Sequence, residues 1–227
     1  MEAGISNESA CLERLLAGAR EMGLVIDGRQ QGRLIGFLSL LVKWNRAYNL
    51  TAVRDPLQMV GRHLLDSLAV LPHLRQGECL DIGTGAGLPG VPLAIMRPDS
   101  RFVLLDGNSK KIRFVRQAKL ELGLENIEPV HARVEAYRPA SPYPTLVTRA
   151  FSSLPKLLAL SDGLWTQGSE ILAMKGVVPE QEIAQLGARF SCEAIVLKVP
   201  FEEGERSLVR IRQASEDGGQ AAESHRK

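Results

Sequence analysis

The stretch that indicates the fold is "LDIGTGAGLPG", residues 80–90. Its four glycines, at positions 83, 85, 87 and 90, follow a short apolar run that carries one carboxylate, Asp81. In open α/β sheets the turn from the first strand into its helix is where ligands bind, and glycines there allow tight backbone geometry and close approach. The stretch therefore predicts a loop that receives a cofactor.

The charge of the ligand separates two classes of cofactor. Residues 85–90 match the dinucleotide pattern G-x-G-x-x-G, but Asp81 would repel the pyrophosphate of a dinucleotide. S-adenosylmethionine instead presents a cationic sulfonium and an ammonium group. The series Asp81-x-Gly83-x-Gly85-x-Gly87 therefore favours S-adenosylmethionine. A purely structural role for Asp81, as a cap of the turn, stays open.

The segments around this loop predict a mainly parallel sheet covered on both faces, because short apolar runs alternate with amphipathic segments. The last two runs have only "PFEEGERS" between them, which predicts an antiparallel hairpin. Helices are expected over 109–122 and 179–189. The apolar runs are 79–82, 102–106, 127–130, 145–151, 170–174, 193–199 and 208–212.

The chain divides into three parts. Residues 1–75 read as a helical extension, with an apolar stripe over 28–46 and a helix start at Asp55-Pro56. Residues 76–213 form the α/β domain. The tail, 214–227, lacks large apolar residues and is expected to be disordered.

Composition excludes several classes of protein. The 227 residues carry a net charge of +2 and three widely spaced cysteines, so neither a disulfide framework nor a metal site is expected. The N-terminus is polar and acidic, unlike a secretory signal, and the longest apolar run is too short to cross a bilayer. We expect a cytoplasmic monomer that has no membrane partner.

Further site residues follow the later strands. Asp106 ends the second run, close to where a carboxylate accepts hydrogen bonds from ribose hydroxyls, with a cap on the following helix as the alternative. In "VHARVEAY", Val134 is placed to pack on an adenine ring and Arg133 or Glu135 to flank its edge, although the segment alone slightly favours an ordinary loop and helix start. Arg149 and Lys175 end adjacent strands and are the candidate catalytic residues, with plain salt bridges as the alternative.

A basic segment suggests how a nucleic acid would be held. Cations outnumber acids strongly between residues 29 and 65, and the helix over 109–122 adds five more, which is typical of a phosphate-binding face. A solvated surface is the alternative. Trp44 and Tyr48 continue the apolar stripe and are expected in the core. The cations are Arg29, Arg33, Lys43, Arg46, Arg54, Arg62, Lys110, Lys111, Arg113, Arg116 and Lys119.

Six motifs occur in order: "WNRAYNLTAVRDPLQMVGRHLLDSL", "LDIGTGAGLPGVPLAI", "FVLLDGNSKKIRF", "ARVE", "TRAF" and "AMKG". Together, over residues 34–212, they resemble the bacterial small-subunit rRNA guanine-N7 methyltransferases, the glucose-inhibited division protein B family. The resemblance implies a class I S-adenosylmethionine-dependent methyltransferase with a Rossmann-like, seven-stranded sheet. It also implies methylation of N7 of guanine 527 in 16S rRNA, within the free RNA, an assembly intermediate or the 30S subunit.

By motif position, the resemblance implies cofactor contacts from Gly83, Leu88, Val134, Glu135 and Arg149. One departure is Gly107, where serine is expected. Guanine N7 is a bare lone-pair acceptor, so its methylation needs no general base. Three alternatives stay open: a methyltransferase acting on a small molecule or protein, a nicotinamide-dependent oxidoreductase, and a non-catalytic RNA-binding factor.

Overall fold

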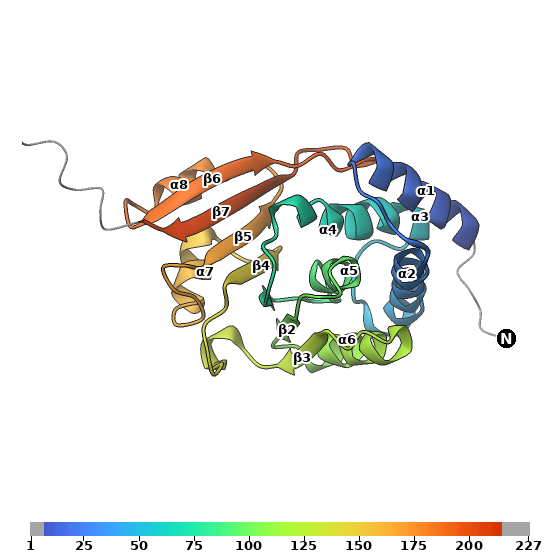
Figure 1. Cartoon of the computed structure of the whole chain (residues 1–227), viewed down its shortest axis with the longest axis horizontal. Coiled ribbons are helices and arrows are strands. Elements are labelled where there is room, and N and C mark those ends of the chain that lie inside the picture. The colour runs from blue at the N-terminus through green and yellow to red at the C-terminus, as the bar shows by residue number, and fades with distance from the viewer. Residues whose placement is uncertain (1–6, 215–227) are drawn as a thin grey trace, which may run out of the picture.

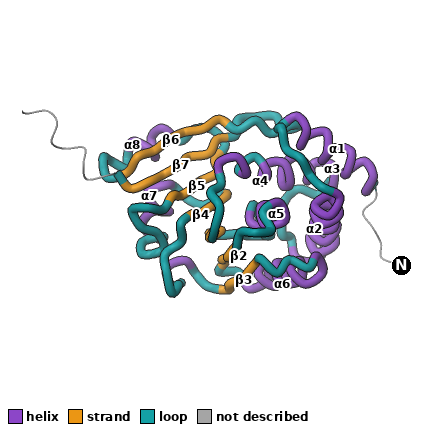
Figure 2. The backbone as a smooth tube through the Cα atoms, in the orientation of Figure 1, coloured by secondary structure: helices purple, strands orange, loops and turns teal. Residues whose placement is uncertain are grey.

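A computed structural model of the chain describes residues 7–214. It contains one seven-stranded sheet with the order β3-β2-β1-β4-β5-β7-β6, flanked by helices on both faces (Figures 1 and 2). Strand β7 runs antiparallel to β5 and β6, and the other neighbouring strands pair in parallel. The predicted Rossmann-like fold is confirmed. The tail over 215–227 lies outside the described residues.

The elements alternate along the chain as the sequence predicts. The strands are β1 (Cys79–Ile82), β2 (Phe102–Asp106), β3 (Ile127–His131), β4 (Thr145–Arg149), β5 (Glu170–Lys175), β6 (Phe190–Val196) and β7 (Ser207–Gln213). The α-helices are α1 (Glu8–Glu21), α2 (Gly28–Tyr48), α3 (Pro56–Met59), α4 (Asp66–Leu68), α5 (Gly90–Met96), α6 (Ser109–Leu122), α7 (Leu154–Leu160) and α8 (Glu180–Ala184). Shorter pieces are the π-helix η1 (Val60–Leu65) and the 3₁₀ helices η2 (Leu71–His73) and η3 (Val134–Ala136).

The largest differences from the predicted boundaries lie at α8 and β6. Helix α8 covers only Glu180–Ala184, because the chain soon takes a left-handed turn at Gly187 (φ 68°). Strand β6 begins three residues before the expected start at 193, because all seven of its residues pair with the seven of β7. The antiparallel hairpin is confirmed.

The first 75 residues share the core of the sheet. Helix α2 begins at a capping box in which Asp27 accepts from the Gln30 backbone N–H. Its fully buried Phe37 packs within 6.0 Å of Phe114 on α6, between ring centroids. Helices α1, α2, α5 and α6 cover one face of the sheet, and α7 and α8 cover the other (Figure 1). The N-terminal helices therefore brace the same sheet that carries the glycine loop.

The aromatic pair on α2 is only partly buried. Trp44 packs edge-on against Phe114, with ring centroids 5.7 Å apart, and belongs to the margin of the core. Tyr48 stacks on Trp44 but remains 37% exposed, so its predicted core position is wrong. The helix ends at Tyr48, and the next residue, Asn49, is left-handed. No helix within residues 7–214 is both long and apolar enough to cross a membrane.

Candidate functional site

A pocket of about 510 Å³ opens at the carboxyl ends of the parallel strands. Its walls come from segments that follow four strands: Gly83 after β1, Asp106 at the end of β2, Val134 and Glu135 after β3, and Phe151 after β4. This is the edge at which open α/β sheets bind ligands. The volume lies within the range of small-molecule sites, so the predicted cofactor location coincides with a real cavity.

The glycine loop has backbone angles that glycine adopts readily and other residues rarely adopt. Gly83, Gly85 and Gly87 have φ values of 70°, 59° and 77°. Gly83 lines the pocket, whereas Leu88 is buried in the apolar core. A Cβ on Gly87 would lie 2.6 Å from a methyl carbon of Val91, so this glycine lets the loop pack against α5. Contacts of Gly85, Gly87 and Leu88 with a cofactor stay predictions.

Asp81 belongs to β1, and the glycine loop encloses its side chain. Its side chain is fully buried, and its Oδ2 accepts from the Thr84 hydroxyl (2.6 Å) and the Gly90 backbone N–H (2.9 Å). Burial raises the pKa of this carboxyl to about 7. The expectation that Asp81 faces a cationic ligand is therefore corrected: the carboxylate does not line the pocket, and it ties the loop to the start of α5.

His63 is a second buried titratable group, on the π-helix η1. Its Nε2 lies 2.8 Å from the Thr51 hydroxyl oxygen. Burial, reinforced by the nearby Arg149 guanidinium, lowers the pKa of His63 to about 4. Its pKa therefore shifts in the direction opposite to that of Asp81, although both imidazolium and carboxylate are disfavoured by the same loss of solvent.

These opposite shifts predict a pH dependence that one substitution exposes. Between pH 4 and 6.5 the folded state holds the proton on Asp81 and the unfolded state does not, so this group makes stability fall as pH rises. His63 is protonated only in the unfolded state over that range, so it makes stability rise. Each slope is about 1.4 kcal/mol per pH unit, and the two nearly cancel. In Asp81→Asn only the contribution of His63 remains, so the stability of this variant should rise with pH.

Denaturant unfolding of the wild type and of Asp81→Asn at several pH values between 4.5 and 6.5 measures this difference. The stability of the variant relative to the wild type should increase with pH. His63→Gln is the matched control and should change the slope in the opposite direction. Parallel pH profiles for all three proteins would show that neither group titrates as its burial implies.

Asp106 is the carboxylate that faces the pocket. Its Oδ2 accepts from the Gly85 N–H (2.9 Å) and its Oδ1 from the Asn108 N–H (2.7 Å), while Lys111 Nζ lies 3.9 Å away. Each carboxylate oxygen can accept a further hydrogen bond. The group therefore suits a ligand that offers paired hydroxyl donors. The cavity beside Gly107 admits a small side chain, since a Cβ there would lie 3.4 Å from Arg133 Cγ.

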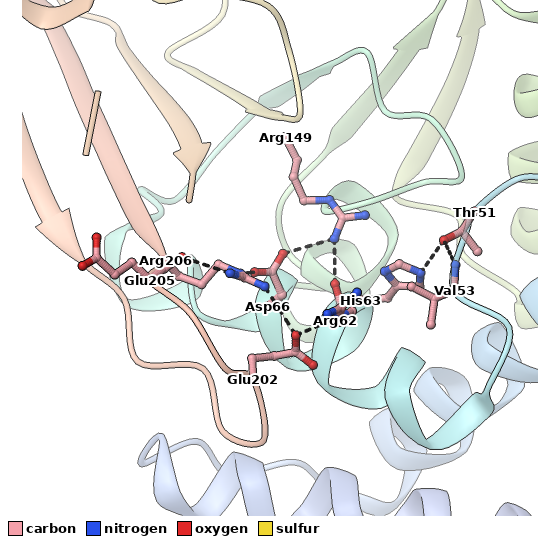
Figure 3. Close-up of polar contacts among 9 residues, drawn as sticks. All are labelled: Thr51, Val53, Arg62, His63, Asp66, Arg149, Glu202, Glu205 and Arg206. Atoms are coloured by element: carbon pink, nitrogen blue, oxygen red, sulfur yellow. Dashed lines mark hydrogen bonds and ion pairs between the residues drawn. The ribbon is translucent and has the colours of Figure 1, made fainter. Parts of the chain in front are cut away.

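The two candidate catalytic cations lie at adjacent strand ends, as expected, but neither lines the pocket. Arg149 pairs in register with Met174, the residue before Lys175. Arg149 Nη1 donates to Asp66 Oδ2 (3.1 Å) and to the Arg62 carbonyl (3.0 Å), as Figure 3 shows. Both cations thus make the salt bridges that the sequence left as the alternative. Lys175 Nζ donates to Glu182 (3.0 Å) and to the Ser152 carbonyl (3.1 Å).

The structure adds pocket residues that sequence reasoning missed. Phe151, Ser152 and Lys156 follow β4 and line the cavity. Their signal was available, because they come directly after a strand that ends at the ligand-binding edge. Ala150 marks the turn with an unusual left-handed φ of 54°. Asp66 carried no such signal, because it lies within an apolar helical stripe.

A parallel sheet with an antiparallel hairpin at its edge, a glycine loop after β1 and an acid at the end of β2 define a class I S-adenosylmethionine-dependent methyltransferase. Solved structures agree on the fold. A putative S-adenosylmethionine-dependent methyltransferase from Methanococcus maripaludis matches with a TM-score of 0.54 at 14% identity, covering 68% of this chain and 87% of that one. One from Aquifex aeolicus matches with a TM-score of 0.53 at 17% identity, covering 72% and 96%.

Residues 30–209 match the family described as rRNA small subunit methyltransferase G, and the chain belongs to that family. The relative from Ectopseudomonas mendocina is 52% identical over 205 residues, covering 89% of this chain and 96% of its own. The relative from Enterobacter sp. (strain 638) is 48% identical over 202 residues, covering 88% and 96%. The predicted family and S-adenosylmethionine as its cofactor are confirmed; a nicotinamide-dependent oxidoreductase is not supported.

Proposed function

We propose that this protein transfers a methyl group from S-adenosylmethionine to N7 of guanine 527 in 16S rRNA. The observation that carries the proposal is the match of residues 30–209 to the rRNA small subunit methyltransferase G family. The substrate is the rRNA itself, an assembly intermediate or the 30S subunit. The protein would act in the cytoplasm, as a monomer.

The pocket suits the cofactor in three respects. The free acceptor positions on Asp106 match ribose hydroxyls, Val134 offers an apolar surface to an adenine ring, and Phe151 encloses the side next to β4. When bound, the cofactor supplies an electrophilic methyl group on a positively charged sulfur. Glu135 stands beside Val134 at the rim, as expected for a group at the edge of the adenine ring.

The reaction needs alignment more than proton transfer. N7 of guanine carries an in-plane lone pair, so nothing has to be deprotonated before attack. Holding N7, the methyl carbon and sulfur in line contributes about 7–11 kcal/mol of the barrier reduction. In this proposal Arg149 lies where cofactor and base meet and would hold guanine O6 or a phosphate, and Lys175 would contact a phosphate.

The N-terminal helices, together with α6 beside α2, would present the RNA-facing surface. Several cations of the basic segment are exposed on α2 and α6, including Arg46, Lys110 and Arg113. Others are already engaged in the fold: Arg33 donates to the Gly123 carbonyl (2.8 Å). Exposed cations on two neighbouring helices support phosphate contacts that carry no sequence information of their own.

Mapping of N7-methylguanine tests the proposal. 16S rRNA and 30S particles that lack the modification are incubated with the protein and S-adenosylmethionine, and methylated positions are cleaved by reduction and aniline treatment. Primer extension should then stop at guanine 527. RNA carrying 7-deazaguanine at this position is the matched control and should accept no methyl group, because it lacks the N7 lone pair.

Two outcomes would contradict the proposal. Methyl label that enters the 7-deazaguanine substrate would place the acceptor on another atom. Label that enters other guanines but not 527 would keep an rRNA methyltransferase while rejecting the assigned nucleotide.

A further inference from the structure

Five charged side chains beside the pocket form a closed network of hydrogen bonds and ion pairs (Figure 3). Asp66 accepts from Arg149 Nη1 (3.1 Å) and Arg206 Nε (3.2 Å). Glu202 accepts from Arg62 Nε (3.1 Å) and Arg206 Nη2 (3.4 Å). The Arg62 carbonyl accepts from Arg149 Nη1 (3.0 Å) and closes the ring. These residues are called the five-residue network below.

Asp66 is the central member of the network. Its side chain is only 7% exposed, and each of its two oxygens receives a different arginine. Little solvent screens such a pair, so the attraction fixes the donors more firmly than a surface ion pair would. Asp66 begins α4 directly after the π-helix η1, so helical backbone on both sides holds the carboxylate in place. Asp66 therefore links the guanidinium groups of Arg149 and Arg206 through its two oxygens.

The network borders the pocket on the side away from Asp106. Arg149 is the last residue of β4, and Phe151, two residues later, lines the cavity. Strand β4 lies next to β1 on the side opposite to β2, which carries Asp106. If the ribose binds at Asp106, Arg149 lies on the strand on the other side of β1. The orientation of Arg149 thus bears on the place where cofactor and base would meet.

We propose that Asp66 is a positioning residue for methyl transfer, which acts by holding Arg149 at the edge of the pocket. This inference rests on the proposed function, in which Arg149 lies at the junction of cofactor and base. Asp66 itself touches neither ligand. Arg206 and Glu202 complete the arrangement by anchoring Asp66 to the connection between β6 and β7.

A purely structural role for Asp66 makes a different prediction, and the fold offers a matched control for it. Glu170 is a carboxylate with a 1% exposed side chain that also lies among several arginines. It begins β5, at the opposite end of that strand from Lys175, and has no contact with the five-residue network among its ion pairs. Its partners are Arg75 (3.3 Å), Arg210 (3.6 Å) and Arg212 (2.8 Å).

A double-mutant cycle tests the inference. Asp66→Asn and Glu170→Gln are each made in the wild type and in Arg149→Lys, and kcat for methyl transfer to 16S rRNA is measured. Asp66→Asn should lower kcat about tenfold or more in the wild type but less than about twofold in Arg149→Lys, because coupled residues are not additive. Glu170→Gln should change kcat by the same factor in the wild type and in Arg149→Lys. Equal factors for Asp66→Asn in both backgrounds would overturn the inference.

A second readout does not depend on activity. Phenylglyoxal modifies accessible guanidinium groups, and mass spectrometry follows the modification of Arg149. The rate should rise about fivefold or more in Asp66→Asn and stay unchanged in Glu170→Gln. An unchanged rate in Asp66→Asn would overturn the inference even where activity falls.

The two readouts separate this inference from the proposed function. A wild type that methylates no 16S rRNA would reject the proposed function, while the modification rates would still decide whether Asp66 holds Arg149. If Asp66→Asn does not fold, Asp66→Glu keeps the charge and moves the oxygens by one methylene. Asp66→Glu should likewise lower kcat more in the wild type than in Arg149→Lys. If Asp66→Glu has the same kcat as the wild type, that result counts against positioning.

Discussion

Gly90→Ala should abolish cofactor binding and lower the free energy of unfolding by about 3 kcal/mol. A Cβ at this position would overlap the Leu104 methyl carbon Cδ2 and lie 2.6 Å from Asp81 Oδ2. Neither neighbour has room to retreat, because both are fully buried. The substitution would also disturb the hydrogen bond from the Gly90 N–H to Asp81, which ties the glycine loop to α5.

Calorimetric titration with S-adenosylmethionine and denaturant unfolding measure the two effects. Gly32→Ala is the matched control: it lies inside α2, and no heavy atom comes within 4 Å of a Cβ there. That variant should bind the cofactor normally and gain up to about 1 kcal/mol from helix propensity. Normal cofactor affinity in Gly90→Ala would show that the loop does not depend on this close packing.

The sequence alone could not identify Gly90 as the tightly packed glycine. The pattern of the loop makes Gly85 equally prominent, yet a Cβ on Gly85 would meet nothing nearer than 3.9 Å. Packing of α5 against β1 and β2 decides the difference, and a linear pattern does not contain that packing. The left-handed φ of 59° at Gly85 still disfavours a side chain there.

The strands were predictable because their signal is local. Residues 79–82 and 102–106 are short apolar runs that end at turn residues, and the structure has strands with these bounds. The π-helix over Val60–Leu65 had no such signal, because its apolar spacing matches an ordinary helix. The start of β6 depended on its pairing with β7, so residue-by-residue pattern placed it too late.

The sequence predicted where the site residues lie better than it predicted which groups they contact. Asp81 and Asp106 are both acids at the ends of strands, but Asp81 lies one residue inside β1, under the start of α5, and Asp106 is the last residue of β2. Arg149 was expected at the carboxyl end of its strand, and it is the last residue of β4. Its partner Asp66 is 83 residues away in sequence, so only the folded chain reveals that contact.

Asp106→Asn should weaken binding of S-adenosylmethionine by about 10- to 100-fold. Hydrogen bonds to a charged group contribute about 1.5–3 kcal/mol, and each 1.4 kcal/mol is tenfold in affinity. Both oxygens of the carboxylate already accept a backbone N–H, from Gly85 and from Asn108. An amide supplies one acceptor oxygen and turns its NH₂ towards the other N–H, so it serves neither the loop nor a ribose as well.

The measurement compares the dissociation constant of the cofactor with the free energy of unfolding. Glu128→Gln is the control, because this exposed carboxylate on β3 pairs with Arg101 and does not line the pocket; its affinity for the cofactor should stay within about twofold of the wild type. Unchanged affinity in Asp106→Asn would refute the ribose contact. The ribose contact requires affinity to fall further than the loss of stability accounts for, because the variant loses an acceptor for the ribose in addition to the one backbone N–H that the amide NH₂ faces. A loss of stability large enough to account for the weaker binding would instead make Asp106 a support of the glycine loop.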